Sequence, residues 1–364
     1  MKNTRRYVSL IERTVLYVYC IIWIPAKRFY LIFKLIIRYY SLQLKMRGQA
    51  PKALRWKRLE QRYKAHKQCV SDLLSCLRHH AVNFSCVNRV ELDRQHLADI
   101  DLLIAVGGDG TVLSAAHFLD HGTIPLLGIN SDPNTRQEDR MVTKKVSDER
   151  RSHGALCMCT ALDMAEGLDQ VLYGGGHLES RTRIRCKVKG TFSETRIVPA
   201  LNDLLIANPS PAAVSRFRMG WLQRVPEGAP SETYGTITRY NGKTYDVTNS
   251  LNVWSSGMWI STPTGSTAAM AAAGGQPMDF HKDELQYLIR EHMMERGVET
   301  DQENFDNGII STGDKMHIRW NSQKGRIFID GSHLTHNLEL GDEIMIDNKA
   351  PPLKMFSHRL DDVS

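Results

Sequence analysis

The sequence predicts an α/β domain followed by a β-rich domain. Between residues 102 and 129, an apolar run, a glycine-rich turn, a helical segment and a second apolar run follow one another. So short a crossover is typical of a βαβ unit in a parallel sheet covered by helices. Beyond residue 179 the apolar residues recur at every second position, which is the period of strands. We therefore expect an α/β domain over residues 59–178 and a β-rich domain over residues 179–349.

The elements of the α/β domain follow from the spacing of its apolar residues. A period of three to four residues predicts helices, and short apolar or alternating runs predict strands. Three successive glycines at 174–176 are expected to end the last helix. The predicted elements are a helix over 59–79, a strand over 82–86, a strand over 102–106, a helix to about Leu119, a strand over 124–129, an exposed polar loop over 134–153 and a helix over 161–172.

The β-rich domain shows alternation in four places, namely 184–188, 217–221, 316–320 and 344–346. One helix is expected within it, from Asp283 to His292. Residues 225–250 contain many Pro, Gly, Ser, Thr and Asn residues, so we expect a long excursion between strands with a hairpin at Asn241-Gly242. Residues 350–364 are expected to form a C-terminal tail.

Residues 1–58 differ from the rest of the chain in charge. They contain 14 Lys and Arg against the single acidic residue Glu12, so their charge of +13 leaves the other 306 residues at −6. The basic character therefore belongs to an N-terminal extension, and the body has no aromatic-interleaved basic patch. We expect no nucleic-acid partner.

The function of this extension is open from sequence. The apolar run Val15–Ile24 is too short to span a bilayer, and Pro25 separates it from a second apolar stretch, Phe29–Tyr40. It could make a membrane or import contact as a surface helix, a signal anchor or a targeting segment, or it could be absent from the mature protein, with Met46 as the start. No strand is evident ahead of residue 59, so the sheet is expected to lack a strand or to be completed by an unplaced segment.

The seven cysteines are scattered, without Cys-x-x-Cys spacing or the His pattern of a zinc site. Such a set indicates reduced thiols inside the cell. The compartment, cytoplasm or an organelle such as the mitochondrion or peroxisome, is left undecided by the sequence.

The glycine-rich turn, Gly107-Gly108-Asp109-Gly110-Thr111, stands between a predicted strand and a predicted helix. Glycines there let the backbone approach a phosphate, and the helix N-terminus offers N–H groups and a positive dipole end. The carboxylate of Asp109 is costly beside a phosphate unless it holds a metal, orients a hydroxyl or takes a proton. The turn therefore predicts phosphoryl transfer, and the alternative is a plain turn in which Asp-Gly supplies a positive φ.

Two later segments carry polar groups suited to a nucleotide. Ser261–Ala268, followed by Ala273-Gly274-Gly275, forms a hydroxyl-rich turn that can present donors to phosphate or ribose oxygens, or can simply cap a helix. Asn202-Asp203 pairs an amide with a carboxylate that could bind a ribose or an adenine edge, although such a pair is also common in turns. Phe328–Gly331 ends a strand and by itself indicates a hairpin.

Taken in this order, Gly107–Thr111, Asn202-Asp203 and Thr262–Gly275 resemble the NAD kinase family over about residues 59–356. Diacylglycerol and sphingosine kinases share the first turn and phosphofructokinases have a close variant, but neither is expected to carry the third segment. Ser255-Ser256-Gly257 and Pro211–Phe217 resemble segments of the plant NADH kinase and mitochondrial NAD kinase branch.

The resemblance implies a Rossmann-like α/β domain joined to a β-sandwich-like domain, with a dinucleotide between them and a homodimer as the working form. It implies transfer of the γ-phosphoryl group of ATP to the 2′-hydroxyl of the adenosine ribose of NADH or NAD⁺. Asp109 would be the general base, Gly107, Gly108, Gly110 and Thr111 would line the phosphates, and Mg²⁺ would be held mainly by phosphate and water rather than by a protein metal site. The residues implied to bind NAD(H) are Asp109, Gly110, Asn202, Asp203, Ser256, Thr264, Gly265, Ser266, Thr267, Ala268 and Ala272.

Three positions depart from the family pattern. Ser256 and Ala269 stand where much of the family has Asp and Tyr, and Asp203 stands where many members have Glu, with the same charge on a shorter side chain. A carboxylate at 4 Å would favour the cationic nicotinamide of NAD⁺ by about 1 kcal/mol in water and roughly 4 kcal/mol at an effective dielectric of 20. We therefore hypothesise that Ser256 removes this bias and makes NADH a good or preferred substrate.

Two alternative functions stay open at this point. A lipid kinase of the diacylglycerol or sphingosine type would use the apolar, basic N-terminus at a membrane, but it gives Thr262–Gly275 no role. A nucleotide-binding protein with an idle site would be indifferent to loss of the Asp109 carboxylate.

Overall fold

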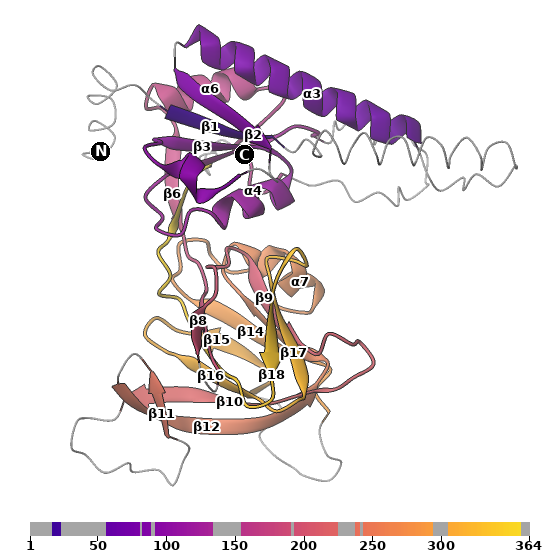
Figure 1. Cartoon of the computed structure of the whole chain (residues 1–364), viewed down its shortest axis with the longest axis vertical. Helices are drawn as coiled ribbons and strands as arrows, with labels where there is room; N and C mark the ends of the chain where they lie inside the picture. The colour runs from indigo at the N-terminus through magenta and orange to yellow at the C-terminus, as the bar shows by residue number, and fades with distance from the viewer. Residues whose placement is uncertain are drawn as a thin grey trace, which may run out of the picture. The chain divides into compact units, whose positions relative to one another are not determined.

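The computed structural model describes residues 17–22, 56–80, 82–88, 92–133, 154–190, 193–224, 237–240, 243–293 and 305–357. The chain divides into two compact units. The α/β unit comprises residues 1–179 and 354–364, and the β unit comprises residues 180–353 (Figure 1).

The α/β unit is built on a seven-stranded sheet of order β2-β1-β3-β4-β20-β6, with β5 paired to β4. The described pairs of β1 with β2 and β3, and of β4 with β3, β5 and β20, are parallel. Helices α3 and α6 cover one face and α4 the other (Figure 1). The elements are β1 (Tyr17–Ile22), α3 (Trp56–His79), β2 (Asn83–Asn88), a 3₁₀ turn η1 (Arg94–Leu97), β3 (Leu102–Gly107), α4 (Asp109–Ala116), β4 (Leu126–Asn130), β5 (Cys159–Thr160), α6 (Met164–Leu172), β6 (His177–Arg181) and β20 (Leu353–Ser357).

The sequence explains why β3 and β4 lie at the centre. All residues of both strands are buried, as their nearly continuous apolar sequences require in a sheet covered on both faces. Leu73 and Leu77 of α3 and Leu168 of α6 share a core with Ile104 of β3 and Ile129 of β4. The predicted parallel sheet with helices on both faces is confirmed.

Strand β1 confirms one of the two expectations for the sheet, completion by a segment that the sequence did not place, and it corrects the description of residues 1–58 as an extension. Part of the apolar run Val15–Ile24 forms β1, which lies between β2 and β3 and pairs in parallel with both. The segment is rich in β-branched and aromatic residues, which suits a central strand. It escaped prediction because about 60 residues separate it from β2. Predictions for the remainder of the extension, including Phe29–Tyr40, lie outside the described residues. Among the described residues, no helix is both long and apolar enough to cross a membrane.

The expected C-terminal tail, 350–364, is also wrong in part. Its residues 353–357 form β20, in which Met355 pairs with Leu126 of β4. Leu353 and Met355 are buried, but two alternating apolar residues after a Pro-Pro pair are too weak a pattern to predict a strand.

The β unit consists of two antiparallel sheets that share one core. Their orders are β11-β12-β10-β16-β19-β7-β8 and β15-β14-β13-β9-β17-β18. The core joins Phe217 and Trp320, which stack on each other in the first sheet, with Ile206 and Ile327 of the second. The strands are β7 (Arg185–Lys189), β8 (Glu194–Arg196), β9 (Asp203–Ala207), β10 (Ser215–Arg224), β11 (Ile237–Tyr240), β12 (Lys243–Ser255), β13 (Gly257–Ser261), β14 (Leu285–Arg290), β15 (Asn307–Ile310), β16 (Met316–Trp320), β17 (Lys324–Ile329), β18 (Leu334–Glu339) and β19 (Glu343–Asp347).

The helix predicted over Asp283–His292 is wrong, because this segment forms β14 between β13 and β15. Leu285, Tyr287 and Ile289 alternate and are all buried, so cross-strand pairing overrides the helix propensity of the Glu, Leu, Gln and Arg residues nearby.

The segment 225–250 is only partly an excursion. Tyr240 pairs with Lys243, which confirms the hairpin at Asn241-Gly242, and β12 begins directly after it. Residues 225–236, like the expected polar loop 134–153, lie outside the described residues.

Candidate functional site

The glycine-rich turn follows the carboxyl end of β3, where open parallel sheets place their ligands. Gly108 precedes α4 as its N-cap, and Asp109 is the first residue of the helix. Gly107 has a φ of +156°, and a Cβ there would lie 2.3 Å from the Thr111 Oγ1 atom. Only glycine therefore allows the helix to start so close to the strand.

The carboxylate of Asp109 is oriented by backbone groups from a segment 45 residues later. Its Oδ1 atom accepts a hydrogen bond from the Leu156 N–H at 2.9 Å, and its Oδ2 atom accepts one from the Gly154 N–H at 3.2 Å. The neighbouring thiol of Cys157 has its pKa raised by burial and, to a smaller extent, by the charge of Asp109. That thiol therefore stays protonated at neutral pH and is no nucleophile.

In the β unit, the two nucleotide segments predicted from sequence lie side by side. The Thr262 N–H donates to the Asn202 carbonyl oxygen at 2.9 Å, and the Thr262 hydroxyl donates to the Leu201 carbonyl oxygen at 2.5 Å. A Cβ at Gly265 would lie 2.1 Å from the backbone carbonyl oxygen of Asn202. Glycine at this position thus lets the hydroxyl-rich turn pack directly against Asn202-Asp203.

Asp330 completes this cluster, although the sequence indicated only a hairpin there. It lies between β17 and β18 with a φ of +48°, and it is buried. Its carboxylate accepts hydrogen bonds from the N–H groups of Leu201, Asn202 and Asp203, at 2.9, 2.7 and 3.0 Å. Three donors stabilise the charged carboxylate and hold residues 201–203 in place. The contact joins residues about 130 positions apart, so no local pattern could have revealed it.

Two groups of this cluster are suited to a ligand. The buried Oδ1 atom of Asn202 has no hydrogen-bond partner among the described residues. Burial raises the pKa of Asp203 to about 7, and the neighbouring charge of Asp330 adds to the shift. An unpaired buried acceptor costs free energy until a donor arrives, so Asn202 is placed to accept a hydrogen bond from a bound molecule.

The turn after β13 divides into buried and exposed residues. Thr264, Gly265 and Ser266 are buried, and the Ser266 hydroxyl donates to the Pro263 carbonyl at 2.7 Å and accepts the Met278 N–H at 2.9 Å. Ser266 therefore stabilises the turn. The residues that this turn and the short helix α7 (Ala269–Ala272) expose are Thr267, Ala268, Ala271 and Ala272.

Ser256 lies between β12 and β13, and its hydroxyl donates to the carboxylate of Glu291. Glu291 follows β14 with a φ of +41° and is mostly exposed. A carboxylate is thus still present beside position 256, supplied by another strand end. The guanidinium of Arg290 lies 3.9 Å from the same carboxylate and offsets part of its charge, and the hypothesis that Ser256 makes NADH a good substrate stays a prediction.

The structure therefore gathers the predicted residues into two clusters, one in each unit. The first contains Gly107–Thr111, and the second contains Asn202, Asp203 and Thr264–Ala272, with Ser256 at the neighbouring strand junction. No group of three or more His, Cys, Asp or Glu among the described residues could hold a metal ion. A carboxylate at a glycine-rich helix N-terminus and a separate cluster of polar groups are residue types that phosphoryl-transfer enzymes use.

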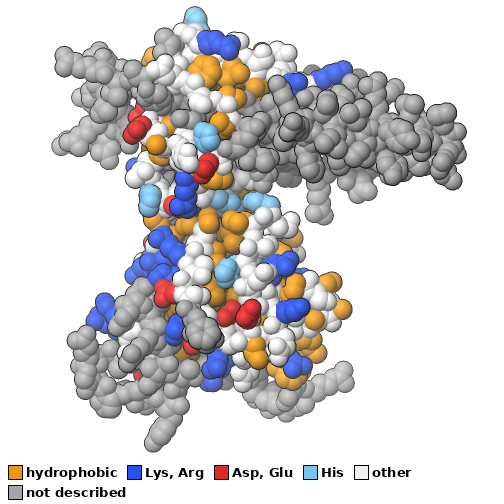
Figure 2. Space-filling view, viewed as in Figure 1, with side chains coloured by type: hydrophobic (Ala, Val, Ile, Leu, Met, Phe, Trp, Pro, Cys, Tyr) orange, Lys and Arg blue, Asp and Glu red, His pale blue; other side chains and the backbone are white. Residues whose placement is uncertain are grey.

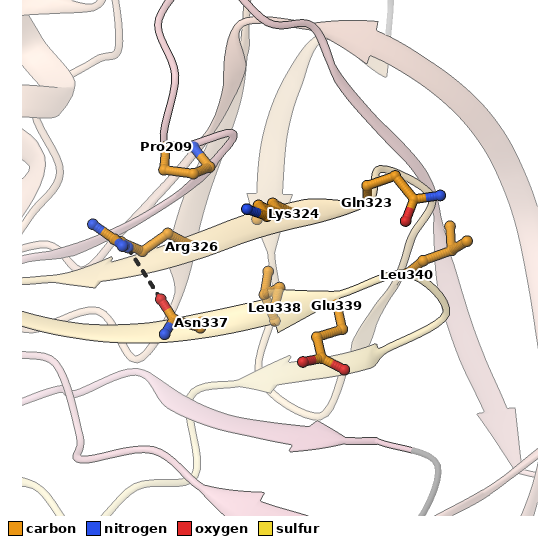
Figure 3. Close-up of a pocket in the computed structure, with 9 residues that line it drawn as sticks. Pro209, Gln323, Lys324, Arg326, Asn337, Leu338, Glu339 and Leu340 are labelled. Atoms are coloured by element: carbon orange, nitrogen blue, oxygen red, sulfur yellow. Dashed lines mark hydrogen bonds between the residues drawn. The ribbon is translucent and has the colours of Figure 1, made fainter.

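A cavity of about 550 Å³ beside the β17–β18 hairpin belongs to neither cluster (Figure 3). Lys324, Arg326 and Glu339 line it, and Arg326 donates to the Asn337 side chain across the two strands. None of the predicted site residues lines this cavity, so it is not part of the candidate site. On the face that Figure 2 shows, basic and acidic side chains both occur on the β unit.

Comparisons with known proteins agree with this class. A family model described as the ATP-NAD kinase N-terminal domain matches residues 40–132. A probable NADH kinase of Oryza sativa subsp. japonica is 35% identical over 311 residues, which cover 85% of this chain and 86% of the relative. An NADH kinase of Arabidopsis thaliana is 34% identical over 84% of this chain and 88% of its own length. The crystal structure of yeast NADH kinase complexed with NADH covers 96% of this chain and 86% of its own, with a TM-score of 0.57 at 16% identity, and shows the shared fold.

The chain belongs to the NAD kinase family, and by this homology it is an enzyme, a kinase of NAD or NADH. The resemblance to plant NADH kinases seen in the sequence is confirmed. The alternatives of a lipid kinase and of an idle nucleotide site are therefore set aside.

Proposed function

We propose that this chain transfers the γ-phosphoryl group of ATP to the 2′-hydroxyl of the adenosine ribose of NADH or NAD⁺. The observation that carries the proposal is the carboxylate of Asp109, which stands at the first residue of α4 with both oxygens oriented by backbone N–H groups. Phosphoryl transfer needs an oriented base on the attacking hydroxyl and N–H donors near the phosphates. A strand, a glycine turn and a helix N-terminus supply both.

In this proposal ATP enters with its Mg²⁺ as the substrate. The described residues offer no cluster of metal-binding side chains, so phosphate and water oxygens would supply most of the ligands of Mg²⁺. Gly107, Gly108, Gly110 and Thr111 line the phosphates, and Asp109 takes the proton of the 2′-hydroxyl as the new P–O bond forms. ADP leaves with the charge that the Mg²⁺ neutralises.

Asn202 and Asp203 bind the nucleotide being phosphorylated. The unpaired Oδ1 atom of Asn202 accepts a hydrogen bond from an amino or hydroxyl group of the nucleotide. The carboxylate of Asp203 accepts hydrogen bonds from ribose hydroxyls. Thr264, Thr267, Ala268 and Ala272 complete the pocket, while Gly265 and Ser266 hold its backbone.

From the resemblance we also propose a homodimer that works inside the cell, in the cytoplasm or an organelle.

We expect the pH profile of kcat/KM for NADH to show an acid limb with a midpoint near the Asp203 pKa of about 7. Below that pH Asp203 is protonated and loses acceptor capacity for ribose hydroxyls, whereas above it the carboxylate binds fully. The measurement is kcat/KM from about pH 5.5 to 9 for the native protein and for Asp203→Asn, which should lack the limb. Asp246→Asn changes another buried carboxyl group of the same unit and should retain it. An acid limb that persists unchanged in Asp203→Asn would contradict the assignment.

The carboxylate of Glu291 is expected to affect the preference of the enzyme for NADH or NAD⁺. With position 256 facing the nicotinamide, as the resemblance implies, the Glu291 carboxylate beside Ser256 favours the cationic ring of NAD⁺, and the guanidinium of Arg290, 3.9 Å from that carboxylate, reduces the effect. Because Glu291 is mostly exposed, the interaction in water of about 1 kcal/mol is the relevant one. Glu291→Gln should therefore raise the ratio of kcat/KM for NADH to that for NAD⁺ by at most about fivefold.

The matched control for this variant is Glu339→Gln, which removes an exposed carboxylate of β18 and should leave the ratio unchanged. Both substrates are assayed side by side with saturating ATP. An unchanged ratio in Glu291→Gln would show that this carboxylate does not act on the nicotinamide. A tenfold preference of Glu291→Gln for NAD⁺ would also overturn the hypothesis that a pocket without this charge accepts NADH well.

A further inference from the structure

The turn formed by residues 154–157 supplies two hydrogen bonds to the side chain of Asp109. Gly154 donates to one carboxylate oxygen and Leu156 to the other. Two donors two residues apart, one on each oxygen, fix both the position and the rotation of the carboxylate plane. A carboxylate has about four acceptor sites, so these two hydrogen bonds alone do not use up its acceptor capacity.

This turn is itself held firmly against β4. The Cys157 N–H donates to the Gly154 carbonyl at 2.9 Å, which closes the turn, and the Met158 N–H donates to the Gly128 carbonyl at 3.0 Å. Gly128 permits this approach, since a Cβ at that position would lie 2.6 Å from the Leu156 carbonyl oxygen. The orientation of Asp109 therefore depends on the packing of the turn against the central strand.

Gly154 is the position at which this arrangement is most sensitive to substitution. Its φ is +72°, and a Cβ there would lie 2.6 Å from the Nδ2 atom of Asn130. Asn130 cannot easily move, because its Oδ1 atom accepts the Asp132 N–H and its carbonyl accepts the Ala161 N–H. With Asn130 in place, a side chain at 154 collides with this amide and strains the turn that carries the two N–H donors.

We propose that Gly154 and Leu156 are positioning residues for Asp109, aligning its carboxylate with the hydroxyl that it deprotonates. This inference rests on the proposed function of Asp109 as the general base. A base that is correctly placed but free to rotate loses the alignment on which proton transfer depends, and a displacement of about 1 Å can cost about 10²-fold in rate. The turn acts through Asp109 and touches no substrate.

The first test is Gly154→Ala, assayed with MgATP and NADH. We expect kcat to fall by about 10- to 100-fold while KM for both substrates changes by less than about twofold. Gly313→Ala is the matched control, since Gly313 also has a positive φ, +103°, but has open space around its Cβ position. It carries the backbone strain of the substitution without touching Asp109, and its kcat should be unchanged.

The decisive test is the double variant Asp109→Asn/Gly154→Ala. If the turn acts only through the carboxylate, the double variant has the kcat of Asp109→Asn alone, because no base is left to position. Losses that multiply would overturn the proposal, and so would a native kcat in Gly154→Ala. A native kcat in Asp109→Asn would instead overturn the proposed function itself, so the two failures are distinguishable.

A second variant keeps the proposal testable if Gly154→Ala fails to fold. Asn130→Ala/Gly154→Ala removes the colliding amide, so the turn can stay closer to its native place. We expect its kcat to lie above that of Gly154→Ala and its Tm to match Asn130→Ala within a few degrees. If relieving the collision leaves kcat at the level of Gly154→Ala, displacement of the turn is not the cause, and the proposal is wrong.

Discussion

Replacing Asp109 by Asn is expected to lower kcat by about two to four orders of magnitude, the usual contribution of a positioned general base. Asn keeps the size of the side chain but has no carboxylate to take the proton of the 2′-hydroxyl. One of its two terminal atoms also becomes a donor, which faces a backbone N–H of Gly154 or Leu156. The measurement is steady-state kinetics with MgATP and either NADH or NAD⁺.

The matched control is Asp101→Asn, at an exposed carboxylate just before β3, the strand that Asp109 follows at its other end. This variant should keep the native kcat. Since Asp109 acts mainly in the transition state, its loss should change KM much less than kcat. An unchanged rate in Asp109→Asn would show that the carboxylate is not the general base.

Removing residues 1–45, so that the chain starts at Met46, is expected to abolish cooperative folding of the α/β unit. The deletion removes β1, whose neighbours β2 and β3 then each present an unpaired edge. Two hydrogen-bonded ladders are lost from the middle of the sheet, beside the strand that leads into the glycine-rich turn. The measurement is thermal unfolding and the yield of unaggregated protein for residues 46–364 against the full chain.

The control is a chain that lacks only residues 1–10 and keeps β1 with the residues just before it. It should unfold at the same Tm as the full chain. A sharp transition at the native Tm for residues 46–364 would show that β1 is dispensable, and that the N-terminal segment is an extension after all. Because β1 is part of the fold, kinetic experiments should use the full chain.

The sequence alone predicted correctly those elements whose residues are consecutive in the chain. The strand from Leu102, the glycine-rich turn and α4 are consecutive, so the periods of the apolar residues and the placement of the glycines predict them directly. The same holds for the hairpin at Asn241-Gly242. The three motifs also carried the family resemblance, because each is a short run of residue types whose backbone and polar groups suit a phosphate or a nucleotide.

The errors in the secondary structure predicted from sequence come from strands that pair with distant parts of the chain. Leu285–Arg290 satisfies both a helical and a strand pattern, and only its partners β13 and β15 make it a strand. β1 and β20 are short segments near the two ends of the chain that enter the same sheet far from their sequence neighbours. A pattern in the sequence contains no information on which distant edge a short apolar segment will meet.

The sequence by itself determined the class of the chemistry, since Gly107–Thr111 and Asn202-Asp203 specify what those groups can do. Only the tertiary structure decided how they are held. Asp330 anchors residues 201–203, the turn at Gly154 orients Asp109, and Glu291 accepts a hydrogen bond from Ser256. The physical reason is that hydrogen bonds between residues 35 to 129 positions apart depend on where the strands pair, and the pairing is a property of the folded chain.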